Sequence, residues 1–202
     1  KVEVDKHCYT LFDLAQKYYA ETDGAFNCAS APLSSLWHVD AESIALYRPD
    51  LDGSGASPDL PTPQEVSDTL AYCTPDLVMA IEENGRYYLK KSDARVKLDF
   101  GGIAKGYAVD LCVNILNDYD ISSALLDISG NAYFYGRYID SGKPTDWRVG
   151  VTSPRPRAGE TVSRGYVCAV SLDGDTSAVT SGDYMRYIVG DNSDASKRYV
   201  PH

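Results

Sequence analysis

The stretch LDFGGIAKGY, from Leu98 to Tyr107, decides how this chain can fold. Residues Val96 to Phe100 have the composition of a strand, and the two glycines that follow can turn the chain sharply. Apolar residues then recur at helical spacing, which predicts a helix directly after the glycines. A strand that turns tightly into a helix exposes the N–H groups of the helix start, where anions bind.

Lys105 lies in the first turn of this expected helix, where a cation opposes the helix dipole. The cost is a few tenths of a kcal/mol to about 1 kcal/mol, and a bound anion would offset it. The spacing matches neither GxxxxGK[ST] nor GxGxxG, so it indicates neither a P-loop nor a dinucleotide fingerprint. From spacing alone, a common strand-to-helix turn with an exposed lysine is the alternative.

Before this stretch, the sequence predicts two helices, a loop and a hairpin. Helical spacing of apolar residues predicts a helix over Asp5–Tyr19, and the aperiodic segment Ala25–Trp37 is expected to be an ordered loop. Thr62-Pro63-Gln64-Glu65 has the composition of a capping box, which predicts a second helix start. Asn84-Gly85 between two apolar runs predicts a tight hairpin turn.

After it, the sequence is rich in strand candidates separated by glycine-containing turns. Gly174, between Asp173 and Asp175, is expected to form a hairpin turn. Many strands and about three helices that do not strictly alternate predict an α+β fold, with a mixed, largely antiparallel sheet flanked by helices. The strand candidates are Ser123–Ile128, Ala132–Tyr138, Arg148–Val151 and Val167–Leu172.

The charge balance argues against a nucleic-acid-binding protein. The 202 residues include 19 Lys and Arg against 29 Asp and Glu, a net charge of −10. Binding to nucleic acid would need clustered basic residues on one face. No apolar run approaches the ~18 residues of a membrane span either.

The segment DFGGIAKGYAVD, from Asp99 to Asp110, resembles the central motif of the ApbE-type flavin transferases, the FAD:protein FMN transferases. Further motifs similar to that family's follow in its order over nearly the whole chain. They are TDGAF (22–26), APL (31–33) with LW (36–37), ALLDISGN (124–131), WRVGVTSP (147–154), VTSGDY (179–184) and RYVPH (198–202).

The resemblance implies a single ApbE-like, T-fold-like flavin transferase domain over residues 1–202. A proline- and glycine-rich stretch at about 48–62 is expected to be a flexible insertion. The chain opens at Lys1 without a Met and stops at His202, so we expect the domain to be incomplete at both ends. Members of the family are usually exported, and the resemblance implies a periplasmic or membrane-facing lipoprotein, attached to the membrane only through an N-terminal lipid anchor.

The activity that the resemblance implies is Mg²⁺-dependent cleavage of FAD. FMN is transferred to a Thr or Ser hydroxyl of a target flavoprotein, and AMP is released. The alternative is a relative that binds flavin, or hydrolyses FAD as a pyrophosphatase, without transfer to a protein.

The resemblance also assigns roles to single residues. Asp99 is expected to contact FAD, Lys105 to lie near the phosphates and the Gly102 carbonyl to bind the metal, while His202 matches the proposed catalytic base. Three positions depart from the family's pattern: His38 replaces a small residue, and Asn27 and Cys28 stand in place of an Asp. The remaining expected cofactor-binding residues are Trp37, His38, Val39, Thr180, Ser181 and Gly182.

Overall fold

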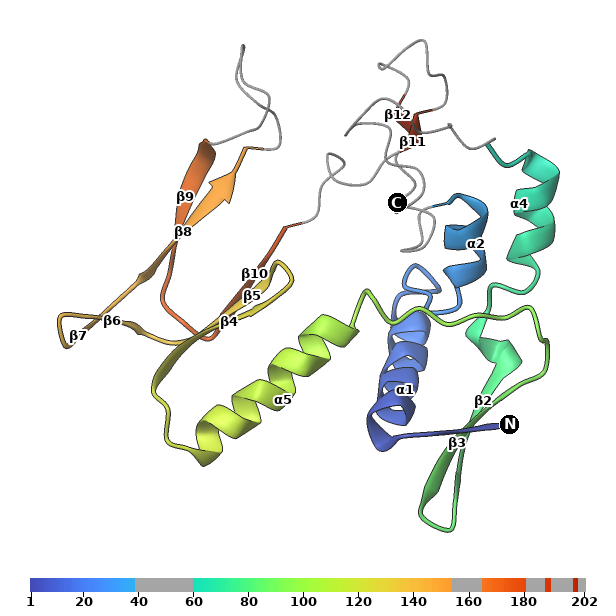
Figure 1. The fold of residues 1–202 in the computed structure, drawn as a ribbon, viewed down its shortest axis with the longest axis horizontal. Coiled ribbons are helices and arrows are strands. Elements are labelled where there is room, and N and C mark those ends of the chain that lie inside the picture. The colour runs from blue at the N-terminus through green and yellow to red at the C-terminus, as the bar shows by residue number, and fades with distance from the viewer. Residues whose placement is uncertain (39–59, 154–164, 181–187, 190–197, 200–202) are drawn as a thin grey trace. The chain divides into compact units, whose positions relative to one another are not determined.

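The computed structural model describes residues 1–38, 60–153, 165–180, 188–189 and 198–199 (Figure 1). The chain divides into two compact units, and the division falls between Ala104 and Lys105, inside the glycine-containing stretch. The prediction of one domain over 1–202 stays a prediction, as does the insertion at about 48–62, most of which lies outside the described residues.

The first unit packs helix α1 (Lys6–Glu21) on a three-stranded antiparallel sheet, as Figure 1 shows. Its core is made by buried residues of the helix, the sheet and the segments between them: Phe12, Ala15, Cys28, Ala29, Val78 and Val96. The sheet order is β1-β3-β2, with β1 at Val2–Val4, β2 at Val78–Glu83 and β3 at Arg86–Lys91. The other elements of the unit are α2 (Ala31–Leu36), α4 (Pro63–Leu70), the 3-10 helix η1 (Pro75–Leu77), and the antiparallel pair β11 (Ile188–Val189) and β12 (Arg198–Tyr199).

The local signals of this unit are confirmed. The Asp5 carboxylate caps α1 by accepting from the Cys8 N–H at 2.8 Å. The capping box of α4 is complete, because the Thr62 hydroxyl accepts from the Glu65 N–H at 3.2 Å while the Glu65 carboxylate accepts from the Thr62 N–H at 2.7 Å. The β2–β3 hairpin turns at Asn84 and Gly85, both with positive φ.

Two expectations for this unit are wrong. The segment Ala25–Trp37 is not all loop: it contains α2, whose first turn holds Pro32, a residue that is well suited to a helix start. The segment Val96–Phe100 is not a strand, since it pairs with no strand of the described residues. Other contacts hold it instead: Val96 is fully buried, and the Asp99 N–H donates to the Cys28 carbonyl at 2.7 Å.

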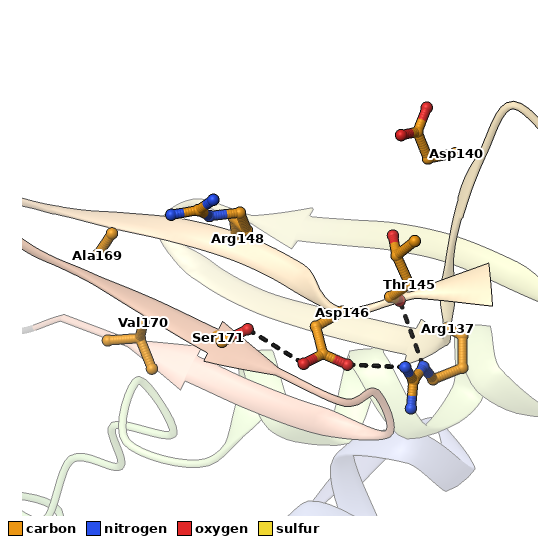
Figure 2. A pocket seen from close by; sticks show the side chains of 8 residues that line it. All are labelled: Arg137, Asp140, Thr145, Asp146, Arg148, Ala169, Val170 and Ser171. Atoms are coloured by element: carbon orange, nitrogen blue, oxygen red, sulfur yellow. Dashed lines mark hydrogen bonds and ion pairs between the residues drawn. The ribbon is translucent and has the colours of Figure 1, made fainter. Parts of the chain in front are cut away.

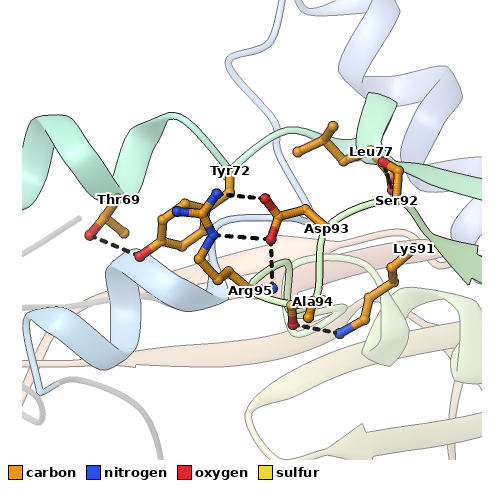
Figure 3. A network of polar contacts seen from close by, with 8 residues as sticks. All are labelled: Thr69, Tyr72, Leu77, Lys91, Ser92, Asp93, Ala94 and Arg95. Carbon is orange, nitrogen blue, oxygen red and sulfur yellow. Dashed lines mark hydrogen bonds and ion pairs between the residues drawn. The ribbon is translucent and has the colours of Figure 1, made fainter.

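A polar network anchors the chain just before this segment (Figure 3). The Arg95 guanidinium donates to both carboxylate oxygens of Asp93, at 3.0 and 2.6 Å, and its carbon lies 4.6 Å from the centre of the Tyr72 ring. The Lys91 ammonium donates to the Val96 carbonyl at 2.7 Å. These contacts fix the path of the chain that leads to Asp99.

The Asp93–Arg95 pair should make stability depend on acid pH. Hydrogen bonds from Arg95 lower the pKa of Asp93 from its ordinary 3.8 to about 2. A carboxylate with a depressed pKa stabilises the fold fully above its ordinary pKa and loses that contribution as pH falls toward the folded-state value. We expect the melting temperature of Asp93→Asn to lie below that of the wild type at pH 6 and to converge with it between pH 3.8 and about 2. A difference that stayed constant across this range would contradict the assignment.

The second unit contains helix α5 (Ala104–Asp118) and strands β4 to β10. One antiparallel sheet has the order β10-β5-β4, and two antiparallel ribbons pair β6 with β7 and β8 with β9. All strand pairs among the described residues are antiparallel, and the α+β class is confirmed. The strand bounds are β4 Ser123–Ile128, β5 Asn131–Gly136, β6 Tyr138–Asp140, β7 Lys143–Thr145, β8 Trp147–Thr152, β9 Tyr166–Leu172 and β10 Thr176–Val179.

Two further expectations are corrected here. The turn at Gly174 does not close a hairpin, because β9 pairs with β8 while β10 pairs with β5. The expected strand Ala132–Tyr138 is divided into β5 and β6 at Gly136. The Gly136 N–H donates to Asp175 at 3.0 Å and its carbonyl accepts from the Trp147 indole at 2.8 Å, so these bonds replace continued strand pairing. No helix in the described ranges is long and apolar enough to cross a membrane.

Candidate functional site

The turn from Asp99 to Ala104 is held by its own hydrogen bonds. One carboxylate oxygen of Asp99, Oδ1, accepts from the Gly101 N–H at 2.7 Å. The Phe100 carbonyl accepts from the N–H groups of Ile103 at 2.9 Å and Ala104 at 2.7 Å. Asp99 and Gly102 are exposed, and among the described residues the Asp99 Oδ2 and the Gly102 carbonyl lie outside these bonds.

Both glycines of the turn lie so close to neighbouring side chains that a larger residue would crowd them. A Cβ on Gly101 would lie 2.9 Å from Asp99 Oδ1, and a Cβ on Gly102 would lie 3.0 Å from Cε2 of Phe26. Phe26 belongs to the TDGAF segment, so the turn packs directly on a motif about 75 residues earlier in the chain. The sequence places both motifs in one family pattern, and the structure brings them into contact.

The TDGAF segment is a rigid support for the turn. The Thr22 hydroxyl donates to the Tyr18 carbonyl at 2.7 Å and accepts from the Phe26 N–H at 2.9 Å. The Gly24 N–H donates to the Tyr19 carbonyl at 2.8 Å, which ends α1. The Phe26 ring packs edge-on against Tyr18, with centroids 6.1 Å apart. The sequence did not reveal that Thr22 and Phe26 position the turn. The TDGAF motif that contains both residues could have pointed to such a role.

The positions that depart from the family's Asp have structural roles. The Asn27 side-chain amide donates to the Cys73 carbonyl at 2.7 Å, and its oxygen accepts from the Ala29 N–H at 2.8 Å. Cys28 is buried, and burial raises the pKa of its thiol to about 11. The thiol therefore stays protonated near neutral pH and packs in the core.

Trp37 and His38 follow α2 and form its C-terminal cap. The Trp37 N–H donates to the Leu33 carbonyl at 2.9 Å, and the His38 N–H donates to the Ser35 carbonyl at 3.1 Å. Both side chains are half-buried, and His38 has a φ of 53°. Backbone hydrogen bonds to α2 thus fix the conformation of this segment. That a nucleotide binds beside it stays a prediction.

In the second unit, Lys105 is half-buried in the first turn of α5, and that turn holds no acidic residue. Gly106 beside it is exposed, and a Cβ there would meet nothing within 4 Å. Packing therefore gives no reason for a glycine, although alanine would favour the helix. Thr180 is exposed directly after β10.

A shallow groove of about 550 Å³ lies elsewhere on this unit, over the β6–β7 and β8–β9 ribbons (Figure 2). Its charges are partly paired internally: Arg137 binds Asp146 at 2.8 Å, and the Ser171 hydroxyl donates to Asp146 at 3.2 Å. None of the site residues expected from the sequence lines it. The lining residues are Arg137, Asp140, Thr145, Asp146, Arg148, Ala169, Val170 and Ser171.

Four expected site residues, Val39, Ser181, Gly182 and His202, lie outside the described residues. Within the described part of the chain, no three His, Cys, Asp or Glu side chains are placed to hold a metal ion. The Gly102 carbonyl is an oxygen donor of the kind that Mg²⁺ accepts, but by itself it is only one ligand.

The amino-acid sequence of this chain is similar to those of curated FAD:protein FMN transferases. The FAD:protein FMN transferase of Treponema pallidum is 28% identical over 198 residues, covering 94% of this chain and 49% of the relative. That of Klebsiella pneumoniae is 27% identical over 190 residues, covering 94% of this chain and 50% of the relative. The chain thus spans about half the length of the curated relatives it matches.

Solved structures show the same similarity. The crystal structure of the ApbE protein from Thermotoga maritima matches with a TM-score of 0.68 at 29% identity, covering 95% of this chain and 54% of that one. The flavinyl transferase ApbE of Pseudomonas stutzeri, in its apo form, matches with a TM-score of 0.57 at 25% identity, covering 85% and 46%. The family model described as the ApbE family matches residues 1–201. Because that match extends over nearly the whole chain, this protein belongs to the ApbE family.

Proposed function

We propose that this protein is an FAD:protein FMN transferase, which moves FMN from FAD onto a hydroxyl of a target flavoprotein and releases AMP. The observation that carries the proposal is the family match over residues 1–201, which includes the segment that folds as a glycine turn into α5. The names of the matched relatives, FAD:protein FMN transferases, support the same activity.

The reaction replaces the phosphoanhydride bond of FAD by a phosphoester bond to the acceptor. The acceptor Thr or Ser oxygen attacks the FMN phosphorus, the bond from this phosphorus to the bridging oxygen breaks, and AMP leaves with that oxygen. The hydroxyl proton must pass to a base, a role that we assign to His202 from the family resemblance. Such a step needs an anion-binding site and charge neutralisation.

Residues of this chain offer the matching chemistry. The first turn of α5 provides N–H groups and the positive end of the helix dipole, and Lys105 adds a full positive charge. The Asp99 carboxylate uses Oδ1 for the Gly101 N–H, and we assign its Oδ2 to a hydrogen bond from FAD. From the family resemblance alone, we also assign nucleotide binding to Trp37–Val39 and Thr180–Gly182.

Mg²⁺ belongs to the proposal as well. The Gly102 carbonyl would be one of its oxygen ligands. When bound, the ion would neutralise charge on the pyrophosphate. A periplasmic or membrane-facing location, as an exported lipoprotein, is proposed from the resemblance alone.

The test is incubation of the full-length protein with FAD and a fragment of an acceptor flavoprotein, with Mg²⁺ or with a chelator. We expect AMP release together with an FMN-sized mass gain of the acceptor, both dependent on the metal. The matched control is an acceptor whose target Thr is replaced by Val, which should gain no mass.

Other outcomes favour the alternative. AMP release with water as the acceptor, and no mass gain with any flavoprotein fragment, would indicate an FAD pyrophosphatase. FAD binding without AMP release would indicate a flavin-binding relative, and the catalytic role of His202 would then be withdrawn.

A further inference from the structure

Asn131 carries a buried oxygen without a hydrogen-bond partner. It is the first residue of β5 and only 7% exposed, and no group in the described part of the chain donates to its Oδ1. A buried polar atom left without a partner costs about 1–3 kcal/mol. Native proteins keep few such atoms, and a role in ligand binding is one explanation for them.

The strand register shows which face of the sheet Asn131 occupies. Its direct partners are Ile128 on β4 and Val179 on β10, both apolar, and neither side chain can donate a hydrogen bond. The pairing of β5 is regular through residue 136, so Tyr133 and Tyr135 lie on the same face as Asn131.

Helix α5 contacts this face at Tyr135. The Tyr135 hydroxyl donates to the Asn117 side chain of α5 at 2.6 Å. Burial, followed by the negative charges of Asp175 and of Asp110 on α5, raises the pKa of Tyr133. The chain passes from the end of α5 into β4 after four residues, and β4 pairs antiparallel with β5, so β5 and α5 run in the same direction.

Extending this register places Asn131 under the start of α5. From Tyr135 back to Asn131 the strand covers about 13 Å, a distance that a helix covers in about nine residues. Counting back from Asn117 by that number leads to residue 108, which lies in the second turn of α5, within one turn of Lys105 and Gly106. Figure 1 shows the β4–β5 turn and the N-terminal end of α5 at the same end of this unit.

Three features therefore meet at the start of α5: the N–H groups and charge of the first turn, a glycine that no packing requires, and a buried acceptor. The first suits a phosphate, and the second leaves room for a ligand to approach the backbone. The third suits a hydrogen-bond donor, which phosphate oxygens are not. A ligand that satisfies all three carries phosphate and, close to it, a hydroxyl or an N–H.

We infer that Asn131 is a nucleotide-binding residue, whose Oδ1 accepts a hydrogen bond from a sugar-type hydroxyl or an N–H of the nucleotide bound at the start of α5. The inference rests on the proposed function, in which FAD is that nucleotide. FAD has ribityl and ribose hydroxyls on either side of its pyrophosphate, so both groups can be engaged together.

The test compares FAD and inorganic pyrophosphate as ligands for Asn131→Leu. Loss of the hydrogen bond should weaken FAD binding about tenfold. Pyrophosphate has no sugar hydroxyl or N–H, and its affinity should stay unchanged. The melting temperature of the ligand-free variant should equal or exceed that of the wild type, because an unpartnered polar atom has been removed. Asn131→Ala also removes the hydrogen bond but adds no bulk. If both variants weaken FAD binding, the effect comes from loss of the hydrogen bond and not from crowding by leucine.

Asn117→Leu is the matched control, because this asparagine lies on α5 in the same unit, and its side-chain oxygen has a hydrogen-bond partner. It should lower the melting temperature through loss of the Tyr135 bond and leave FAD affinity unchanged. If the Asn131 variants also lose stability and bind FAD as the wild type does, Asn131 is a structural amide and the inference is overturned. If the wild type binds neither FAD nor pyrophosphate, the proposed function fails and the inference fails with it.

Discussion

Replacing Asp99 by Ala is expected to abolish measurable FAD binding, a loss of about a hundredfold or more in affinity. A hydrogen bond to a charged group contributes about 1.5–3 kcal/mol, which corresponds to roughly 10- to 150-fold. Alanine removes this bond and also the cap on the Gly101 N–H, so the turn that leads into α5 loses its internal support. Titration of the full-length protein with FAD, followed by flavin fluorescence, measures the change.

Asp99→Asn separates the two effects. The asparagine side chain retains an oxygen that can accept from the Gly101 N–H, so the turn should keep its shape while the negative charge is lost. We expect its FAD affinity to fall between those of the wild type and Asp99→Ala. If Asp99→Ala folds normally and binds FAD as tightly as the wild type, Asp99 does not contact the ligand.

Replacing Gly136 by Ala is expected to destabilise the second unit by about 3–5 kcal/mol, combining backbone strain and overpacking. Gly136 has a φ of 61°, and a Cβ there would lie 2.1 Å from the Ser122 carbonyl oxygen. That oxygen belongs to the backbone, so relief of the clash would have to move the chain at the edge of β4. The Gly136 bonds to Asp175 and Trp147 would be strained at the same time.

Gly142→Ala is the matched control. Gly142 also has a positive φ, 81°, but a Cβ there would meet nothing within 4 Å. Its substitution should cost only the backbone strain, about 1–2 kcal/mol. Denaturant unfolding of both variants gives the two values, and hydrogen exchange assigns them to the unit that opens. Equal losses at the two sites would show that the clash at Gly136 is relieved without cost.

Local signals predicted the elements of the first unit well. The caps at Asp5 and Thr62–Glu65 and the turn at Asn84-Gly85 act within a few residues, so the sequence around them contains the whole cause. The prediction of a strand at Val96–Phe100, which was based on composition alone, was wrong. This segment has the apolar content of a strand, but its backbone and side chains are held by Cys28, Lys91 and the core.

For the candidate site, the sequence located the motif and the structure explained how it is built. The resemblance named Asp99, Gly102 and Lys105, yet it contained nothing about the contact between Gly102 and Phe26. It included Asn131 only as the last letter of a motif. The burial of that side chain depends on how the second unit packs, which a pattern along the chain does not contain.

By itself, the sequence determined the starts of α1 and α4, the first hairpin, the α+β class and the family, because each depends on residues close together or on the order of motifs. Only the tertiary structure decided that β9 pairs with β8 and β10 with β5 across the turn at Gly174. It alone decided that the oxygen of Asn131 is buried without a partner. The physical reason is that strand pairing and burial depend on contacts between distant residues, whose free energy is gained only when the whole unit packs.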